Sequence, residues 1–169
     1  MSYTYTPNTV NGLMPAEEEI LWRELPGARY QTQQELRHIS NPACGDLRNR
    51  TQSLAFLNFN ITTLPITITG IEIRLEAQRN GRIADDQIQL IYRGDVIGEN
   101  NFNYETTIDG HLILTNDTTY GGPEDLWGAT ITPEMLQDPE FGILLKFQSH
   151  PYYPHRSSMQ INSVSLTVY

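Results

Sequence analysis

The stretch that decides the fold is "ITITGIEIRLEAQRN", residues 66–80. From Ile71 to Ala77 every second residue is apolar, and a period of two is typical of a β-strand with one buried face. The isoleucines before Gly70 fall on the opposite parity, so the alternation changes phase at this glycine. We interpret Gly70 as a β-bulge that restores one inward face, because glycine tolerates the backbone angles of a bulge. A plain break between two strands is the alternative.

Shorter segments elsewhere in the chain show strand-like patterns, at 19–25, 35–40, 53–61, 86–98, 111–115, 141–148 and 159–169. In the last of them Ile161 is out of phase with Val164, which indicates a second bulge at Asn162–Ser163. Turn-forming residues separate these segments. The pattern therefore predicts about eight short strands.

One helix is expected, near residues 133–137. Thr132 can cap its first turn, Pro133 suits the first helical position, and Asp138-Pro139 ends it. Short strands with a single short helix predict an all-β fold, an antiparallel β-sandwich with a jelly roll as the leading topology. We expect one domain over 19–169, preceded by an extended N-terminal arm over 1–18, which has no apolar period; a disordered terminus is the alternative for the arm.

Composition limits the classes of partner. The chain has 169 residues with 20 acidic and 11 basic side chains, a formal net charge of −9, and no cluster of Lys and Arg, so we expect no nucleic acid as partner. No run of apolar residues is long enough for a membrane-spanning helix, and the first residues do not form a secretory signal. Cys44 is the single cysteine, which excludes an intrachain disulfide and a cysteine-based zinc site.

The segment "TTYGGPEDLWG", residues 118–128, is either a ligand loop or a corner between two strands. A phosphate-binding loop would need a following Lys-Ser/Thr or a long helix, and neither follows. We interpret the glycines as a turn and Trp127 as an apolar anchor that closes it, with a ligand site as the alternative. Neighbouring carboxylates at Asp85-Asp86 and Glu124-Asp125 would point to opposite faces of a strand, so no glycosidase pair is identified.

No catalytic, cofactor-binding or metal-binding residue is assigned, and no cofactor is expected. The four histidines, at 38, 111, 150 and 155, are scattered. Calcium is an open alternative in the loops, through Asn100, Asn101, Asn116, Asp117 or Asp125, although no EF-hand pattern is present. In "HPYYPH", residues 150–155, Tyr152 and Tyr153 are candidates for surface contact, as are Tyr3 and Tyr5 in the arm.

Three segments of the second half are similar to a domain type of tailed-bacteriophage structural proteins and some bacterial surface proteins: residues 66–101, residues 119–148 and "INSVSLTVY" at 161–169. The resemblance covers roughly residues 54–169. It implies a jelly-roll sandwich and no catalytic residues. The positions that match the family pattern are Tyr120, Gly121, Asp125, Leu126, Trp127, Gly128, Phe141 and Gly142, all explicable as turn or core determinants.

The resemblance implies a non-enzymatic structural protein of a bacteriophage virion, made in the host cytoplasm. Its partners would be other virion proteins, in capsid decoration or in the tail, and a homo-oligomer is expected, with a trimer by analogy to virion symmetry. Sheet edges, loops and the N-terminal arm would make the contacts. The alternatives are a carbohydrate-binding module for host attachment, with Trp22, Tyr152 and Tyr153 as platforms, and a polysaccharide hydrolase.

Overall fold

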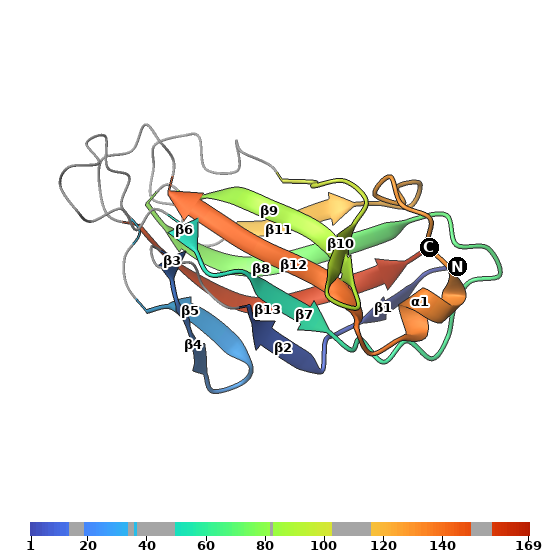
Figure 1. The fold of residues 1–169 in the computed structure, drawn as a ribbon, viewed down its shortest axis with the longest axis horizontal. Coiled ribbons are helices and arrows are strands. Elements are labelled where there is room, and N and C mark those ends of the chain that lie inside the picture. Colours follow the sequence, from blue (N-terminus) through green and yellow to red (C-terminus); the bar gives the residue numbers. More distant parts are fainter. Residues whose placement is uncertain (14–18, 34–35, 37–49, 82, 103–115, 150–156) are drawn as a thin grey trace.

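The computed structural model describes residues 1–13, 19–33, 36, 50–81, 83–102, 116–149 and 157–169. In this part of the chain two sheets pack face to face, with one short helix at one end (Figure 1). The expected fold class, an all-β antiparallel sandwich, is confirmed.

Sheet A has six described strands in the order β11-β8-β13-β5-β4, with β1 also on β13. Their bounds are β11 (Asn116–Gly121), β8 (Ile71–Asn80), β13 (Ser158–Val168), β5 (Arg29–Thr32), β4 (Trp22–Leu25) and β1 (Tyr3–Tyr5). The pairings within this sheet are antiparallel.

Sheet B has seven described strands in the order β10-β9-β12-β6-β3, with β7 also on β12 and β2 on β7. Their bounds are β10 (Asp95–Ile97), β9 (Ile83–Tyr92), β12 (Phe141–Ser149), β6 (Arg50–Thr51), β3 (Glu19–Ile20), β7 (Leu54–Leu57) and β2 (Thr9–Gly12). Only the short β3–β6 pair among them is parallel. From β8 onward the chain alternates between the sheets: β8, β11 and β13 belong to sheet A, and β9 and β12 belong to sheet B. The short β10 is a hairpin partner of β9 in sheet B. This alternation is the jelly-roll arrangement.

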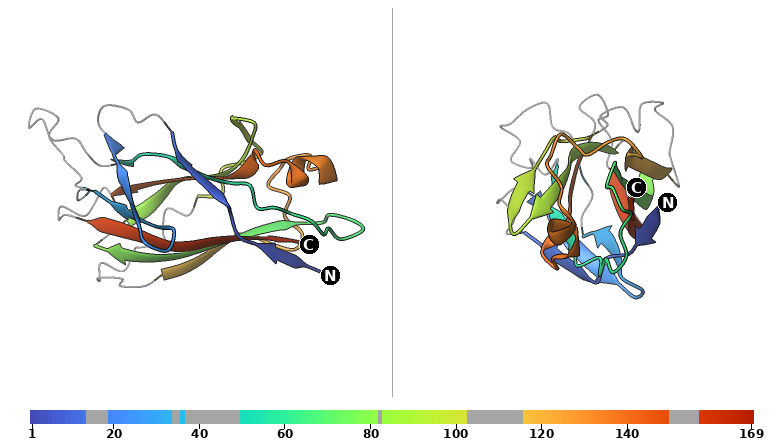
Figure 2. Two further views of the ribbon diagram at one scale, coloured as in Figure 1. Left: turned by 90° about the horizontal axis from the view of Figure 1, so that it is seen from below. Right: turned by 90° about the vertical axis from the view of Figure 1, so that its right-hand side faces the viewer.

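The core lies between the two sheets (Figure 2). On β8 the odd-numbered residues from Ile71 to Ala77 are fully buried, while the even-numbered ones are half-buried or exposed, as the period of two predicts. Sheet B contributes Ile143, Leu145 and Phe147 from β12, all fully buried. Full burial of such a side chain stabilises the fold by about 1.5–3 kcal/mol.

The expected bulge at Gly70 is wrong, because β8 begins only at Ile71 and the preceding Ile66 is fully exposed. Gly70 has a different role. A Cβ at this position would lie 2.1 Å from the carbonyl oxygen of Gly122, so the glycine allows two backbone segments to approach closely.

The second expected bulge is confirmed. Opposite β8, the register of β13 shifts between Ile161 and Ser163, which leaves Asn162 without a partner. The buried residues Ile161 and Val164 therefore both face the core, although three positions separate them. A further register shift lies on β9, where Asp86 is unpaired between partners of Lys146 and Phe147.

The helix α1 (Pro133–Gln137) has the expected bounds. The Thr132 hydroxyl oxygen accepts a hydrogen bond from the Met135 backbone N–H at 3.2 Å, which satisfies one of the free donors of the first turn. Leu136 is buried and joins the core. No helix in the described ranges is long and apolar enough to cross a membrane.

The described N-terminal residues are extended, and they pair with both sheets. Strand β1 pairs with the end of β13, and β2 pairs with β7, so the chain crosses from sheet A to sheet B between Tyr5 and Thr9. The two termini lie close together at one end of the molecule (Figure 1). This segment thus covers one open side of the sandwich.

Candidate functional site

The segment 118–128 forms a tightly bonded corner. Trp127 is completely buried, and its indole N–H donates to the Ile71 carbonyl oxygen at 2.9 Å. The Trp127 backbone N–H donates to Asp125 Oδ1 at 2.7 Å, and the Ile71 N–H donates to the Asp125 carbonyl oxygen at 2.9 Å. Both the side chain and the backbone of the corner are therefore engaged with the start of β8.

Glycines at the corner allow close packing. Gly121 has a φ of 76°, and a Cβ there would lie 2.2 Å from the Ile71 carbonyl oxygen. Gly128 has a φ of 65°. On β12, Phe141 is buried in the core, and a Cβ at Gly142 would meet the Phe56 backbone. The positions that carried the family resemblance thus lie in turns or in the core.

The candidate contact tyrosines are placed differently from one another. The Tyr5 hydroxyl donates to the Thr63 carbonyl oxygen, and its ring packs against the core. Tyr3 is half-buried and its hydroxyl donates to Met1 Sδ at 2.7 Å. Tyr152 and Tyr153 lie outside the described residues, as do the four histidines and Cys44.

Trp22 is not a surface platform, so this part of the carbohydrate alternative is wrong. The side chain is 8% exposed and packs edge-on against Phe147. Its indole N–H donates to the Gln52 carbonyl oxygen at 2.8 Å. The ring anchors β4 to the core and offers no free face to a sugar.

The residues considered for calcium are hydrogen-bonded to the fold where the structure describes them. Asn100 Oδ1 accepts from the Ile88 N–H at 2.8 Å, and Asn101 Nδ2 donates to Asp125 Oδ2 at 3.4 Å. Asp117 forms an ion pair with Arg74 at 3.3 Å. Over the described ranges, no group of three or more His, Cys, Asp or Glu side chains is placed to hold a metal ion.

A buried charged cluster connects the two sheets. Arg79 of β8 and Asp85 of β9 are both fully buried, with Arg79 Nη2 at 3.2 Å from Asp85 Oδ1. The Tyr120 hydroxyl donates to Asp85 Oδ2 at 2.8 Å, and Arg79 lies over the Phe147 ring. Burial, together with the negative charge of Asp85, raises the pKa of Tyr120. The cluster ties strands together inside the core and has no exposed surface on which to bind a ligand.

The outer face of sheet B carries polar side chains beside a small apolar cluster. Ala55, Ile91 and Leu144, with the half-buried Leu57, form this outer apolar cluster, separate from the main core. Beside it, Gln87 Nε2 donates to Gln89 Oε1 at 2.9 Å. Gln89 is the direct cross-strand partner of Leu144. The described elements form two layers, so no third layer of described helices or strands covers this face (Figure 2).

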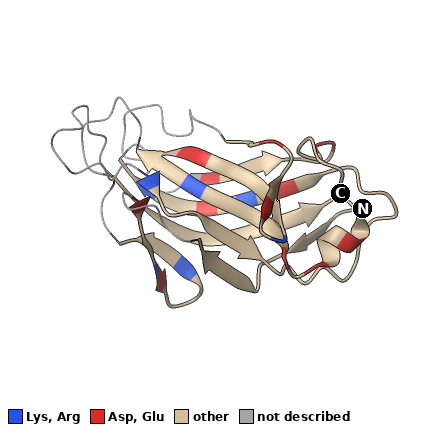
Figure 3. Ribbon diagram, in the orientation of Figure 1, with Lys and Arg blue, Asp and Glu red and all other residues tan. Residues whose placement is uncertain are grey.

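Charges on the outer face of sheet B are paired. Lys146 Nζ lies 2.5 Å from Glu19 Oε2, and Arg50 Nε lies 3.9 Å from Asp86 Oδ2. Over the described ribbon the basic residues are dispersed among acidic ones (Figure 3).

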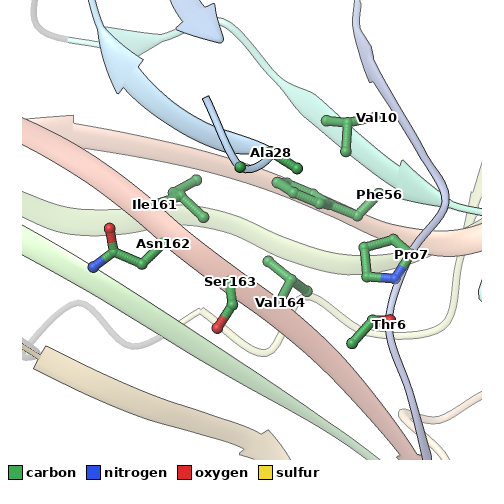
Figure 4. Close-up of a pocket in the computed structure, with 10 residues that line it drawn as sticks. Thr6, Pro7, Val10, Ala28, Phe56, Ile161, Asn162, Ser163 and Val164 are labelled. Carbon is green, nitrogen blue, oxygen red and sulfur yellow. The ribbon is translucent and has the colours of Figure 1, made fainter. Parts of the chain in front are cut away.

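A pocket of about 230 Å³ opens on the side of the sandwich that the N-terminal segment crosses. Its lining residues come from four separate parts of the chain: Thr6, Pro7, Val10, Gly27, Ala28, Phe56, Ile161, Asn162, Ser163 and Val164. The side chains of Ile161 and Val164 point to the Phe56 side, whereas those of Asn162 and Ser163 point away (Figure 4). The bulge on β13 therefore shapes one wall of the pocket.

The sequence contained a signal for the buried pair but none for the pocket. Arg79 continues the odd-numbered parity of Ile71, Ile73 and Leu75, which places an arginine on the inward face. An inward charge requires a partner, so the parity alone could have identified it. The pocket needs segments that lie up to about 150 positions apart, and no local pattern reports such contacts.

No family model matches the sequence, and no curated protein is found to be similar to it. Among solved structures, a xylan-binding module, CBM15, is similar at 10% identity with a TM-score of 0.45, over 99% of this chain and 96% of that chain. The Stig cyclase Fisc from Fischerella sp. TAU is similar at 11% identity and a TM-score of 0.42, over 99% and 84%. Peanut lectin is similar at 10% identity and a TM-score of 0.39, over 100% and 97%.

These likenesses concern the fold. The TM-scores are all below 0.5, so these likenesses do not bear on what this chain does. The function of this chain has to be argued from its own surface.

Proposed function

We propose that this chain is a non-enzymatic binding module whose ligand is a neutral carbohydrate, held on the outer face of sheet B. The observation that carries the proposal is the row of amide side chains beside the outer apolar cluster. Gln87 Nε2 donates to Gln89 Oε1, and Gln89 Nε2 donates to the Gly98 carbonyl oxygen, so each amide is held in place and retains one further N–H and acceptor capacity for a ligand. The half-buried Leu57 and exposed Val96 supply apolar surface across the same face. A sugar ring has both a hydroxyl rim and an apolar C–H face, which this combination matches.

The paired charges favour an uncharged ligand. Lys146 is paired with Glu19, and the exposed Arg50 has Asp86 at 3.9 Å, so each of these cations lies beside a carboxylate that would repel an acidic sugar. Gln87 and Gln148 lie on this face by strand register, and their Nε2 groups donate within the protein to Gln89 and to the Asp85 carbonyl oxygen. Hydrogen bonding to hydroxyl groups is therefore the chemistry that this surface offers.

The carboxylates of this region support binding over hydrolysis. A glycosidase needs two carboxylates on either side of one bond, one of them positioned to donate a proton. Asp85 is fully buried against Arg79, and Asp86 is paired with Arg50.

A glycan array followed by calorimetry tests the proposal. We expect the protein to bind one class of neutral polysaccharide, and the double change Gln87→Ala with Gln89→Ala to weaken binding at least about tenfold, which corresponds to loss of one or two hydrogen bonds. Gln78→Ala is the matched control, because Gln78 is an exposed glutamine on the outer face of sheet A. Absence of binding to any neutral glycan, or equal loss in the control, would count against the proposal.

A structural role in a bacteriophage virion is the second candidate, and the exposed sheet edges favour it. Strands β4 and β10 end their sheets, and no described strand covers their outer sides. An open edge can accept a strand of a neighbouring virion protein or of a second copy, so the homo-oligomer belongs to this candidate. Immunogold microscopy of particles, combined with light scattering for the number of copies, would test it; a monomer absent from all particles would refute it.

A further inference from the structure

We propose that the pocket beside β13 binds a single aromatic side chain, presented by the end or the turn of a partner polypeptide. The site is distinct from the outer face of sheet B, since it opens between the sheets, where the N-terminal segment crosses from one to the other. Three features of the pocket indicate the kind of group that it would bind: its volume, the charge of its lining, and the strand edge that β13 exposes beside it.

The volume and the apolar walls set the size of the occupant. The pocket measures about 230 Å³, and its inward walls are Val10, Phe56, Ile161 and Val164 (Figure 4). A dry apolar cavity of about 150 Å³ holds benzene. The pocket therefore has the volume for one aromatic side chain, and it borders the Phe56 ring, which is 2% exposed and already packs edge-on against Tyr30.

Among the described residues that line the pocket, none has an acidic, basic or thiol side chain. Its two side-chain polar groups on β13 are already engaged on the outer face: Asn162 Oδ1 accepts from Gln160 at 2.8 Å, and the Ser163 hydroxyl donates to Glu76 at 2.9 Å. A charged ligand would lose its hydration without compensation, so the occupant is neutral.

The strand edge shows that the occupant carries peptide groups. On the side of β13 opposite β8, β5 pairs at Gln160 and Ile161, and β1 pairs from Leu166 to Val168. Between them, no described strand pairs with residues 162–165 on this side. In an antiparallel strand every second residue directs both its backbone N–H and its C=O to the same neighbouring strand position. Residues 162–165 therefore direct some backbone N–H and C=O groups to the side away from β8, where no described strand pairs with them. The same edge of β13 already pairs with β5 and β1. We call the unpaired stretch between them, residues 162–165, the gap; it continues the same pairing edge.

The gap also limits the length of the occupant. Four residues span about 13 Å along a strand. Thr6 closes the gap at one end and the turn at Gly27-Ala28 lines the other. A long strand cannot lie between them, whereas two or three residues at a chain end or turn can. No atom lies within 4 Å of a Cβ built on Gly27, so the turn leaves the entrance open.

Amide NMR spectra of the full chain test this inference with N-acetyl-tryptophanamide, which carries one aromatic side chain and two peptide groups. We expect saturable shifts at the amides of Ser163, Val164 and Ser165, with a dissociation constant on the order of 1 mM. Two controls separate its features: N-acetyl-alaninamide lacks the ring, and indole lacks the peptide groups. Both are expected to bind at least about tenfold more weakly, as loss of a buried ring or a hydrogen bond implies.

Filling the pocket gives the decisive variant. Val10→Trp places an indole at the wall and is expected to weaken binding at least about tenfold. Asn11→Trp is the matched control, since Asn11 is exposed on the same strand, and it should bind as the parent does. If Val10→Trp does not fold, Pro7→Trp at the entrance replaces it.

Each outcome separates this site from the sugar-binding face. Equal binding of indole and N-acetyl-tryptophanamide would overturn the polypeptide occupant, and shifts confined to other residues would overturn the site. The Gln87→Ala, Gln89→Ala variant should retain full binding of N-acetyl-tryptophanamide, so this inference and the carbohydrate proposal can fail independently.

Discussion

The corner at 118–128 and the gap beside β13 both interrupt regular strands, yet one is filled and the other is open. At the corner, Trp127 supplies a large ring and a hydrogen bond to Ile71, and the surrounding glycines let backbone segments meet. At the gap, the nearest described residues of the N-terminal segment and of the β4–β5 turn are small, and they leave a pocket of about 230 Å³ beside the buried Phe56. A single large side chain therefore fills the corner, whereas small side chains leave the gap open.

The largest effect is expected for Trp127→Ala. Loss of a fully buried indole should lower the free energy of unfolding by about 3–5 kcal/mol, measured by urea denaturation. Trp127→Phe should cost less, because it keeps most of the volume and removes only the hydrogen bond to Ile71. A loss below about 1 kcal/mol for the alanine variant would show that the corner is not coupled to the core.

A smaller effect on the free energy of unfolding is expected when alanine replaces either of two glycines with positive φ, Gly121 and Gly27. Gly121→Ala should cost about 2–4 kcal/mol, because the backbone strain adds to a clash with the Ile71 carbonyl oxygen. Gly27→Ala, at the edge of the gap, should cost only about 1–2 kcal/mol, since strain acts there without a clash. Thermal unfolding of both variants measures the difference, and equal losses would contradict the contrast between the filled corner and the open gap.

The smallest effect on stability is expected when one methylene group is added beside the pocket. Val10→Ile adds one methylene next to the pocket and should stabilise the protein by up to about 1 kcal/mol. Ala77→Val adds volume in the closed core of β8 and should destabilise it by about 1–3 kcal/mol. Chemical denaturation of the pair is the measurement. Destabilisation by Val10→Ile would indicate that the pocket closes in solution.

Local patterns predicted the longest strands and the helix of this fold, but not β1, β2, β5 or β11. The strand expected at 111–115 and all but Leu36 of the one expected at 35–40 lie outside the described residues. The alternation from Ile71 onward, the caps of the helix at Thr132 and Asp138, and the phase change at Asn162–Ser163 each reflect short-range stereochemistry. The same alternation at Ile66 and Ile68 was misleading, because extended loop residues can alternate without pairing, and here Ile66 faces solvent.

Contacts between distant segments were beyond such patterns. The carbohydrate alternative named Trp22 as a surface platform, but packing against Phe147 buries it. The pairing of residues 3–12 with both sheets has no local signature, since their composition resembles that of a free terminus. The pocket depends on the path of the N-terminal segment, and the outer face of sheet B depends on the pairing of β12 with β7 and β9. Both are contacts between distant segments, so the sequence did not locate either surface.

The pairing of β1 with β13 has a mechanical consequence. Tyr3 lies opposite Val168, so residues 1 and 169 are at the same end of the β1–β13 pair. Tension between them would therefore break the backbone hydrogen bonds of this pair one after another, beginning at the outermost. Such an unzipping geometry yields at low force compared with shearing of a whole ladder. Peeling β1 away would also draw Thr6 and Pro7 from the pocket, so a pull on the two ends would disassemble the wall of that site before the long β8–β13 ladder separates.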